Sequence, residues 1–475
     1  MNASSRLKPR ALAVAIALTL SGCATSALER DADHVNAFAK QQWNASARLH
    51  NGSAERERAQ AQVTSLLQSP LSADDAVRIT LANSPALQAM LADGARASAQ
   101  ATQSARLPNP VFTFERLVRR EDGAVDLDIG RMLSASLLEL IFLPARLDAA
   151  EAMQQQARLN TVASTIEAVA NTRQAWVRAV AAEQSLKYVE QVMDAADASA
   201  ELAKRMYQAG NFSKLQRARQ QAFYADAVAQ LARARQAAVA SREALVRALG
   251  LDATQRGLLK LPERLPDLPT PRAEPDMAQA AMDQRVDVQM AKASLNAIGK
   301  KNGFNTASSF VNAFHVAGVR NSETGKPPQR GYELELSLPL FDFGDAARAG
   351  NAAAYLAALN RAAQVAIDAE SQVREQYAGY RTALDIANHY RQEIIPLRKS
   401  IADETLLKYN GMLVSVFDLL AESRAQIGSV ILAIDAERDF WLADAALQAT
   451  LLGKPMAGVA MSATATASAD SGPSH

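Results

Sequence analysis

The sequence predicts a mainly helical protein with a small β part, in which long helices pair as antiparallel hairpins. Three features support this prediction. One stretch of the chain recurs, in blurred form, about 200 residues later. The 65 residues between Pro144 and Gly210 contain neither glycine nor proline. Two short segments, one in each half of the chain, alternate polar and apolar residues as strands do.

The recurring stretch covers residues 204–251 and returns at 407–453, with an offset of 202. Each copy is expected to run as a helix to a tight turn and then as a second helix to a closing Leu-Gly pair. After the turn, the heptad-spaced positions of the two copies are Tyr224, Ala227, Leu231, Ala234, Ala238, Ser241, Leu245 and Ala248, and Gln426, Ser429, Ala433, Ala436, Phe440, Ala443, Leu447 and Thr450. Many of these seam residues are small, so the helix axes can approach closely.

Composition and charge exclude other classes of protein. Aromatic residues make up only 5 % of the 475 residues, which argues against several well-filled globular cores. The 51 basic and 50 acidic residues nearly cancel, so no basic field is available to hold nucleic acid. An elongated helical protein that does not bind nucleic acid is the expectation.

The N-terminus has the composition of a secretion signal. Three basic residues precede an apolar run at 11–20 that is too short to span a bilayer. The run ends in Leu-Ser-Gly-Cys, which resembles the bacterial lipobox, whose cysteine becomes the first residue of the mature protein and carries lipid. We therefore expect a signal peptide at 1–22 and lipidation of Cys23, the only cysteine in the sequence. The alternative is a buried structural thiol.

The rest of the chain divides into two similar halves. Residues 23–70 are polar with little periodicity and are expected to form an extended or loosely helical tether. The two repeats, 71–251 and 274–453, each read as helix, strand hairpin, very long helix, tight turn and long helix. A proline-rich linker at 252–273 joins them, and residues 454–475 form a tail expected to be disordered.

Two strand hairpins per chain leave unpaired edges, which cannot lie stably in lipid. Residues 332–338 give the clearest alternation, with aromatic and aliphatic residues on one side and polar residues on the other. Such a pattern fits a barrel wall with lipid outside and water inside, closed by further copies of the chain. A soluble amphipathic sheet would show the same alternation and stays open as the alternative.

Several short motifs, in this order, resemble the outer-membrane efflux channel family of TolC type over about 71–453. They are the Leu-Ser-Ala-Asp-Asp-Ala of 71–76 with the Asn-Ser-Pro-Ala-Leu of 83–87, the Pro-Asn-Pro of 108–110, the Arg-Val-Asp-Val of 285–288, the Leu-Ser-Leu-Pro-Leu-Phe-Asp-Phe-Gly of 336–344 and the Ile-Pro of 395–396. The family motif has proline where this chain has Val286. The resemblance implies a homotrimer in which each chain gives four strands to a twelve-stranded transmembrane β-barrel and long helices to a tunnel across the periplasm. It also implies a periplasmic adaptor (membrane fusion) protein and an inner-membrane pump as partners, and lipid of the outer membrane around the barrel.

The same resemblance assigns roles to the hairpin tips. Residues expected to contact the adaptor are Tyr207, Gly210, Ser213, Tyr409, Gly411 and Ser415. By motif position Asp418 is the acid that constricts related channels, with Glu422 four residues later; the basic tip carries Lys214, Arg217 and Arg219. We hypothesise that Asp418 pairs with Arg217 or Arg219 in a closed gate; solvated surface charges are the alternative. The acids expected to line the barrel interior are Asp126, Asp128, Glu333 and Glu335.

No enzyme chemistry is predicted. The five histidines show no ligand spacing, and the chain has no phosphate loop, nucleophile elbow or convincing catalytic triad, so no metal and no cofactor are expected. The favoured function is the outer-membrane channel of a tripartite efflux or export system. The alternatives are a periplasmic coiled-coil adaptor or scaffold lipoprotein and the outer-membrane component of type I protein secretion. The transported substrate is not indicated by the sequence.

Overall fold

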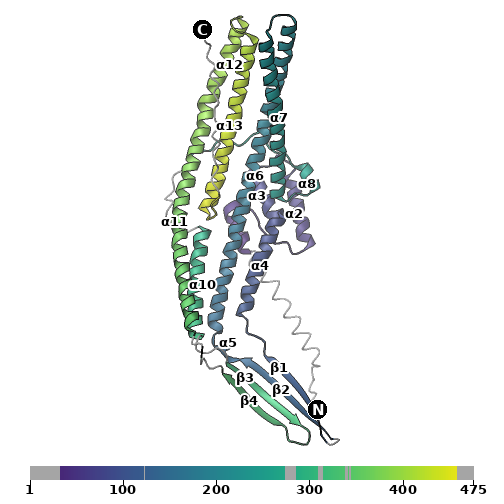
Figure 1. The fold of residues 1–475 in the computed structure, drawn as a ribbon, viewed down its shortest axis with the longest axis vertical. Coiled ribbons are helices and arrows are strands. Elements are labelled where there is room, and N and C mark those ends of the chain that lie inside the picture. The colour runs from purple at the N-terminus through teal and green to yellow at the C-terminus, as the bar shows by residue number, and fades with distance from the viewer. Residues whose placement is uncertain are drawn as a thin grey trace, which may run out of the picture. The chain divides into compact units, whose positions relative to one another are not determined.

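A computed structural model describes residues 33–121, 124–272, 285–308, 314–336, 341 and 344–456. The signal peptide with Cys23, the start of the tether, the end of the linker and nearly all of the tail lie outside the described residues. The chain forms two compact units: Met1–Phe38, Ala89–Ser164 and Arg285–Ala369 in the first, and Ala39–Gln88, Thr165–Gln284 and Glu370–His475 in the second. Each unit is described by itself (Figure 1).

Helices dominate, as the sequence predicts. They are α2 (Ser53–Leu66), α3 (Ala73–Asn83), α4 (Pro85–Ala105), α5 (Leu137–Ile141), α6 (Leu143–Gln208), α7 (Lys214–Leu249), α8 (Ala253–Leu258), α10 (Val286–Ser308), α11 (Asp345–His389), α12 (Ile395–Asn410) and α13 (Val416–Leu451), with a π-helical turn, η1 (Tyr390–Ile394), before α12. The glycine- and proline-free run forms α6, a single helix of 66 residues. None of the described helices is long and apolar enough to cross a membrane.

The first unit contains the predicted strands. They are β1 (Val111–Glu121), β2 (Ala124–Ser136), β3 (Phe314–Glu323) and β4 (Gln329–Leu336), which form one antiparallel sheet in the order β1-β2-β3-β4. β1 and β2 pair in antiparallel register without a bulge along the whole of β1, from Val111 opposite Ser134 to Glu121 opposite Ala124. The alternation of faces is therefore unbroken along both strands. The expected extension of the last strand to Leu338 lies outside the described residues.

Two arginines fix the helices next to this sheet. Arg146 donates to the main-chain oxygens of Ser104 and Arg106, at the end of α4, and pairs with Glu139 on α5. These contacts satisfy carbonyls that a helix end leaves without partners. Arg285, which is fully buried, makes two hydrogen bonds to Asp287, at 3.0 and 2.6 Å, and one to the main-chain oxygen of Ala369. The Arg-Val-Asp-Val motif is thus a buried charge pair at the start of α10.

The predicted seam is correct in the second unit. On α7 all eight seam positions are buried or half-buried, while most residues between them are exposed. On α13 the eight equivalent positions are likewise buried or half-buried, but the C-terminal half of this helix is covered on almost every side, with Phe440, Leu442, Ala446 and Leu447 among its buried residues. The two copies of the repeat therefore use the same seam in different surroundings.

The described part of the predicted tether contains helices, and the second of them packs into a core. Residues 33–43 are helical, and α2 follows at Ser53–Leu66. Val63 and Leu67 are buried in a core that includes Trp176 and Leu71, and the Trp176 indole N–H donates to the main-chain oxygen of Leu71 at 2.8 Å. The burial of apolar residues four apart stabilises the helix although its mean hydropathy is low.

The linker between the repeats lies across helices from both of them. Its main chain accepts hydrogen bonds from Arg242 on α7 at Leu259 and from Trp441 on α13 at Pro266. Tyr377 on α11 donates to the main-chain oxygen of Arg272 at 3.2 Å. Leu259 and Leu265 are buried, so this segment is part of the core of the second unit.

Candidate functional site

The first hairpin tip joins α6 to α7 through a turn whose hydrogen bonds end one helix and start the next. Gly210 has φ +77°, which favours glycine, and the N–H of Asn211 donates to the main-chain oxygen of Met206 at 2.9 Å. Ser213 then caps α7: its hydroxyl accepts from the Gln216 N–H, and the Gln216 side chain accepts from the Ser213 N–H at 2.9 Å.

The second tip, between α12 and α13, repeats this geometry with different residues. The N–H of Leu413 donates to the main-chain oxygen of Lys408 at 2.8 Å, and Ser415 caps α13 with Asp418 in the place of Gln216. The residue with positive φ is Met412 at +59°, whereas its neighbour Gly411 has φ −79°. The offset of 202 aligns Gly210 with Met412, so a side chain occupies the left-handed position in the second tip.

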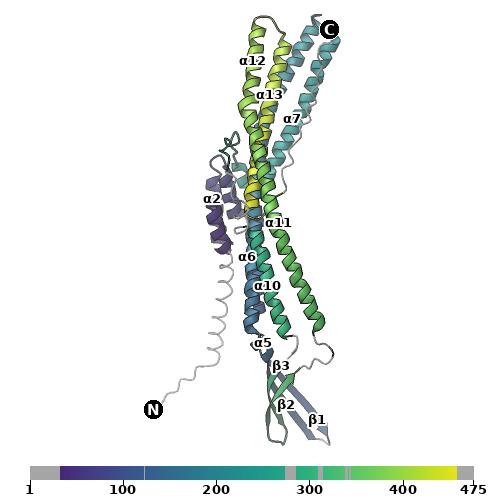
Figure 2. The ribbon, with the colours of Figure 1, turned by 90° about the vertical axis from the view of Figure 1, so that its left-hand side faces the viewer.

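The two tips touch each other. The rings of Phe212 and Phe417 stack with centroids 4.7 Å apart, and the guanidinium of Arg424 on α13 lies 4.4 Å from the centroid of the Phe223 ring on α7. Both views of the ribbon show the tips of α6–α7 and α12–α13 at the same end of the second unit (Figures 1 and 2). These two contacts bring the α6–α7 and α12–α13 hairpins together near their tips.

Asp418 has a structural role that the gate hypothesis did not include. Its carboxylate accepts hydrogen bonds from the Ser415 N–H at 2.9 Å and from the Ser415 hydroxyl at 2.7 Å. The hydrogen bonds from the side chain and main chain of Ser415 lower the pKa of this carboxyl. The pattern Ser-x-x-Asp just before an apolar run is the sequence signal of a capping box and could have identified this role.

The other predicted gate residues have separate places. Glu422, four residues after Asp418, forms an ion pair of 3.6 Å with Arg398 on α12 and is only 20 % exposed. The guanidinium of Arg217 lies 4.7 Å from the centroid of the Tyr207 ring. Lys214 and Arg219 are exposed and form no ion pair with a described residue. Within one subunit, Asp418 and the basic tip thus have other contacts.

The tip surface is unusually apolar for a solvent-facing loop. Its exposed apolar residues are Leu215, Leu407, Met412 and Leu413, with exposed fractions of 62, 66, 93 and 76 %. Tyr207 and Tyr409 are half-exposed beside them. Exposed apolar patches framed by polar side chains mark interaction sites in soluble regions of proteins.

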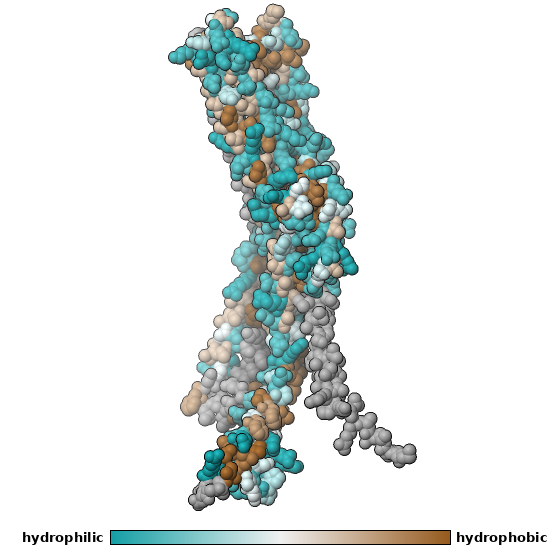
Figure 3. Space-filling model, turned by 90° about the vertical axis from the view of Figure 1, so that its right-hand side faces the viewer, coloured by the Kyte–Doolittle hydropathy of each residue, from teal (hydrophilic) through white to brown (hydrophobic). Residues whose placement is uncertain are grey.

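The sheet has two chemically distinct faces. Residues opposite each other in the register share a face. By this rule all four predicted lumen acids lie on one side of the sheet. The pairs that show this are Leu117–Asp128, Arg119–Asp126, Asp128–Glu323, Ser136–His315, Ala317–Glu333 and His315–Glu335. The opposite side carries the apolar residues Phe112, Phe114, Val118, Val125, Leu127, Leu133, Val316, Tyr332, Leu334 and Leu336. Most of these are exposed in the single chain, and hydrophobic surface gathers on the sheet in Figure 3.

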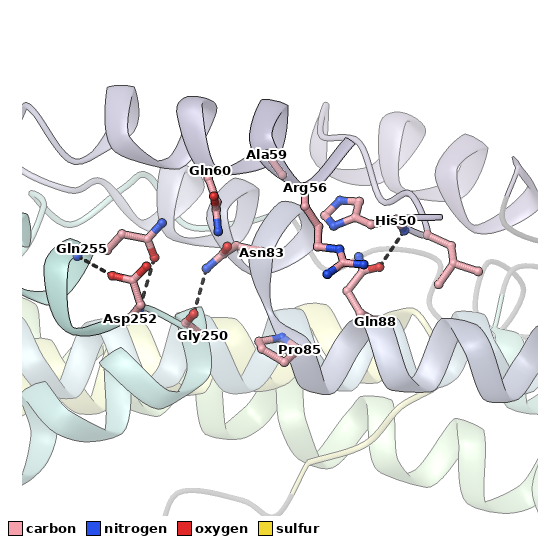
Figure 4. Close-up of a pocket in the computed structure, with 11 residues that line it drawn as sticks. His50, Arg56, Ala59, Gln60, Asn83, Pro85, Gln88, Gly250, Asp252 and Gln255 are labelled. Atoms are coloured by element: carbon pink, nitrogen blue, oxygen red, sulfur yellow. Dashed lines mark hydrogen bonds between the residues drawn. The ribbon is translucent and has the colours of Figure 1, made fainter. Parts of the chain in front are cut away.

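A hollow of about 500 Å³ in the second unit lies between α2, the start of α4 and the end of α7 (Figure 4). Two of the polar side chains that line it have protein partners. Gln88 accepts from the His50 N–H at 2.9 Å, and the Asn83 amide donates to the main-chain oxygen of Gly250 at 2.8 Å. Burial lowers the pKa of the His50 imidazole, and the nearby Arg56 acts in the same direction.

Gly250 explains two sequence motifs at once. It ends α7 with φ +68°, and a Cβ at this position would lie 2.5 Å from the Pro85 Cδ and 2.9 Å from the Ser84 Cα. The closing Leu-Gly and the Asn-Ser-Pro of 83–85 are therefore one packing contact. No group of three or more potential metal ligands occurs among the described residues.

Comparison with known proteins identifies this arrangement. Residues 76–251 match the family model for outer membrane efflux proteins. A membrane protein from Pseudomonas aeruginosa has a TM-score of 0.68 at 20 % identity, with 84 % of this chain and 94 % of that chain covered. The Campylobacter jejuni CmeC outer membrane channel has a TM-score of 0.67 at 15 % identity, covering 84 % and 86 %. The open state of the Neisseria gonorrhoeae MtrE outer membrane channel has a TM-score of 0.61 at 18 % identity, covering 80 % and 89 %.

No curated protein matches the sequence. At these identities the solved structures establish the fold, and the family match applies to residues 76–251. The resemblance inferred from the sequence motifs agrees with this family match, and the predicted long helical hairpins and strands agree with the fold of the solved channels.

Proposed function

We propose that the protein is the outer-membrane channel of a tripartite export system and that three copies are needed to build it. The observation that supports this most is the sheet. β1 and β4 are its edges and have no partner strand among the described residues, while one face is apolar and exposed and the other carries the acids. In lipid, unpaired edge groups cost several kcal/mol each, so the edges must pair with those of other copies.

In this arrangement the apolar face meets lipid and the face with Asp126, Asp128, Glu333 and Glu335 lines a water-filled passage. A passage with these carboxylates favours cations. The lipid attached to Cys23 would anchor the N-terminus in the same membrane. The protein needs no catalytic group, because an inner-membrane pump supplies the energy.

Disulfide cross-linking tests the closure. Cys23 is the only native cysteine and its sulfur carries the lipid in this proposal, so pairs with one new cysteine on β1 and one on β4 report on contacts between subunits without interference. We expect a ladder of dimers and trimers for some β1–β4 pairs, and conductance of the purified protein in planar bilayers. Pairs placed on β1 and β2 provide the control, since they link within one chain. A monomer in detergent with no conductance would contradict the proposal and favour a scaffold lipoprotein.

The tip surface is proposed as the contact for a periplasmic adaptor protein. Its exposed apolar residues, together with the Arg217–Tyr207 stack, offer area that a partner could bury. Substitution of Met412 and Leu413 by aspartate should abolish export in cells and leave bilayer conductance intact. Unchanged export would rule out this surface, and the exposed Glu404→Gln on α12 is a control away from the turn.

Asp418 remains the proposed gate acid, with Arg217 or Arg219 as its partner in the closed trimer. Such a pair would have to replace the bonds from Ser415, so the charge and the cap can be separated. Asp418→Asn removes the charge and keeps an acceptor for the cap, whereas Asp418→Ala removes both. Higher resting conductance in both variants is expected; an unchanged resting conductance in both would remove Asp418 from the gate.

A further inference from the structure

Each of the four strands carries an arginine on the apolar face of the sheet. Arg131 on β2 lies directly opposite Arg320 on β3, and Arg320 lies directly opposite Arg330 on β4. On β1, the residue opposite Arg131 is Phe114. Arg116 lies two residues further along β1, opposite Ile129, and is therefore one position on this face nearer the β1–β2 turn. The four arginines Arg116, Arg131, Arg320 and Arg330 are called the arginine row below.

The row has no acidic counterpart. The register assigns no aspartate or glutamate to this face over the paired residues of the sheet, because Glu115, Asp126, Asp128, Glu323, Glu333 and Glu335 all fall on the other one. None of the four guanidiniums forms an ion pair with a described residue. Like charges directly opposite across strands are destabilising, so the sheet carries a local electrostatic cost in the single chain.

The row lies at a boundary of the apolar surface. On β4, Tyr332, Leu334 and Leu336 follow Arg330 on the same face, which gives about 20 Å of apolar strand on the side away from the β3–β4 turn. Between the row and the β1–β2 turn, the same face carries the pair Val118–Leu127 and then Arg120. An arginine on the lipid-facing side of a barrel costs about 2–4 kcal/mol at the bilayer midplane but only about 0–1 kcal/mol near an interface. This difference favours placing the row at headgroup level.

We propose that the arginine row binds the phosphate groups of lipid headgroups in the outer leaflet of the outer membrane. The proposal rests on the proposed function, since it requires the apolar face to meet lipid and the hairpin turns to face outward. The outer leaflet of this membrane consists largely of phosphorylated glycolipid, which supplies phosphates at the level where the row would lie.

The chemistry of arginine suits this ligand. A guanidinium presents parallel N–H donors that match two phosphate oxygens, and it keeps its charge in a partly dehydrated setting. Neighbouring strands are about 4.8 Å apart, so one phosphate can accept from guanidiniums of two adjacent strands. A bound anion between Arg131, Arg320 and Arg330 would turn their mutual repulsion into attraction.

The test uses the purified detergent-solubilised protein titrated with lipid A carrying both phosphates and with the same glycolipid after removal of its phosphates. Lipid occupancy is read by native mass spectrometry for the wild type and for the variant in which all four arginines of the row are glutamine. Arg119→Gln is the matched control for a single change such as Arg320→Gln, because Arg119 lies on the acidic face. Lysine replacements at the four positions provide a second variant that keeps the charge if the glutamine variant does not assemble.

We expect phosphorylated lipid A to bind the wild type at least 10-fold more tightly than the dephosphorylated form. We expect the glutamine row to lose that preference, the lysine row to keep part of it, and Arg119→Gln to leave it unchanged. Equal binding of both lipids, equal binding by wild type and the row variants, or displacement of lipid A by inorganic phosphate at similar concentration would overturn the proposal. Conductance and subunit mass, measured on the same samples, report separately on the proposed channel.

Discussion

The two hairpins of the second unit follow one plan but differ in how they are held. The first rises as α6 without interruption and turns at Gly210, a residue suited to the left-handed conformation. The second is interrupted by the π-helical turn at Tyr390–Ile394, just before Pro396, and turns at Met412, which is not suited to it. Proline lacks an amide hydrogen and crowds the preceding turn, which accounts for the break in regular helix there.

The caps and anchors differ as well. Gln216 completes the first capping box and the ionisable Asp418 completes the second. The offset of 202 aligns Arg242 on α7 with Asp444 on α13, and both side chains bind the linker, although their charges are opposite. Arg242 pairs with Glu183 and donates to the main-chain oxygen of Leu259. Buried Asp444 pairs with Arg272 of the linker at 3.0 Å. The difference teaches that a duplicated unit can keep its packing while one copy acquires the strained and titratable groups.

The largest expected effect separates the two anchors of the linker. In Arg272→Met, Asp444 loses its ion pair while its side chain is only 6 % exposed, so unfolding should become easier by about 2–3 kcal/mol at pH 7.5. Because Arg272 itself is half-exposed, the cost is placed below that of a fully buried pair. Arg242→Met removes a less buried pair and should cost about 1 kcal/mol. Chemical denaturation of both variants measures the difference.

The pH dependence sharpens this comparison. Burial raises the pKa of the Asp444 carboxyl and the charge of Arg272 opposes that rise, so the folded state binds a proton more readily than the unfolded state. The defect of Arg272→Met should therefore shrink as the pH falls through the raised pKa of Asp444 and grow as the pH rises. Arg272→Lys, which keeps the charge, should behave nearly as the wild type; a defect in Arg272→Met that does not vary with pH would contradict this account.

A smaller effect is expected from exchanging the two turn residues. Met412→Gly relieves a left-handed methionine whose side chain is 93 % exposed, so the second tip should become more stable by roughly 0.5–1 kcal/mol. Gly210→Met should destabilise the first tip by about 1 kcal/mol through backbone strain alone, since nothing lies within 4 Å of the position of a Cβ there. Amide hydrogen exchange at residues 205–216 and 407–418 gives the local stability of each tip, and changes of the same sign in both variants would refute the argument.

The smallest effect concerns the two capping boxes. Hydrogen bonds from Ser415 lower the pKa of Asp418 below its ordinary value of 3.8. Its contribution to the cap is thus present above that value and is lost as the pH falls through the lowered pKa, while Gln216 does not titrate. A carbon-13 titration of the Asp418 carboxyl should show its pKa returning toward 3.8 in Ser415→Ala. No movement of the pKa in that variant would show that the cap is not its cause; Ser213→Ala is the matched control.

The fold was predictable where a local pattern coincides with burial. The alternation at 332–338 and the heptad positions on α7 depend on which side of an element is covered, and that is written directly in residue spacing. The packing of α2 was not predictable from the sequence because α2 has few apolar residues, and the role of Val63 and Leu67 follows only from the core that they share with Trp176. A helix that is stabilised by tertiary contacts leaves little trace in its own sequence.

The position of the candidate site in the chain was predictable from the sequence, but the side-chain contacts within it were not. The repeat locates the tips, whereas the role of Asp418 in the cap follows from the Ser-x-x-Asp pattern and not from the family resemblance. The left-handed residue of the second tip is Met412, which the offset of the repeat aligns with Gly210, although a glycine stands next to it at position 411. The arginine row depends on strand register between residues nearly 190 positions apart, such as Arg131 and Arg320, which residue spacing does not reveal.

The π-helical turn before Pro396 has a geometric consequence. Such a turn accommodates one residue more than regular α-helix, and each residue advances the helical phase by about 100°. Everything that follows on α12 is therefore rotated about its axis compared with an unbroken helix. Loss or gain of that single extra residue would therefore rotate the second tip about the axis of α12 and leave the first tip unchanged.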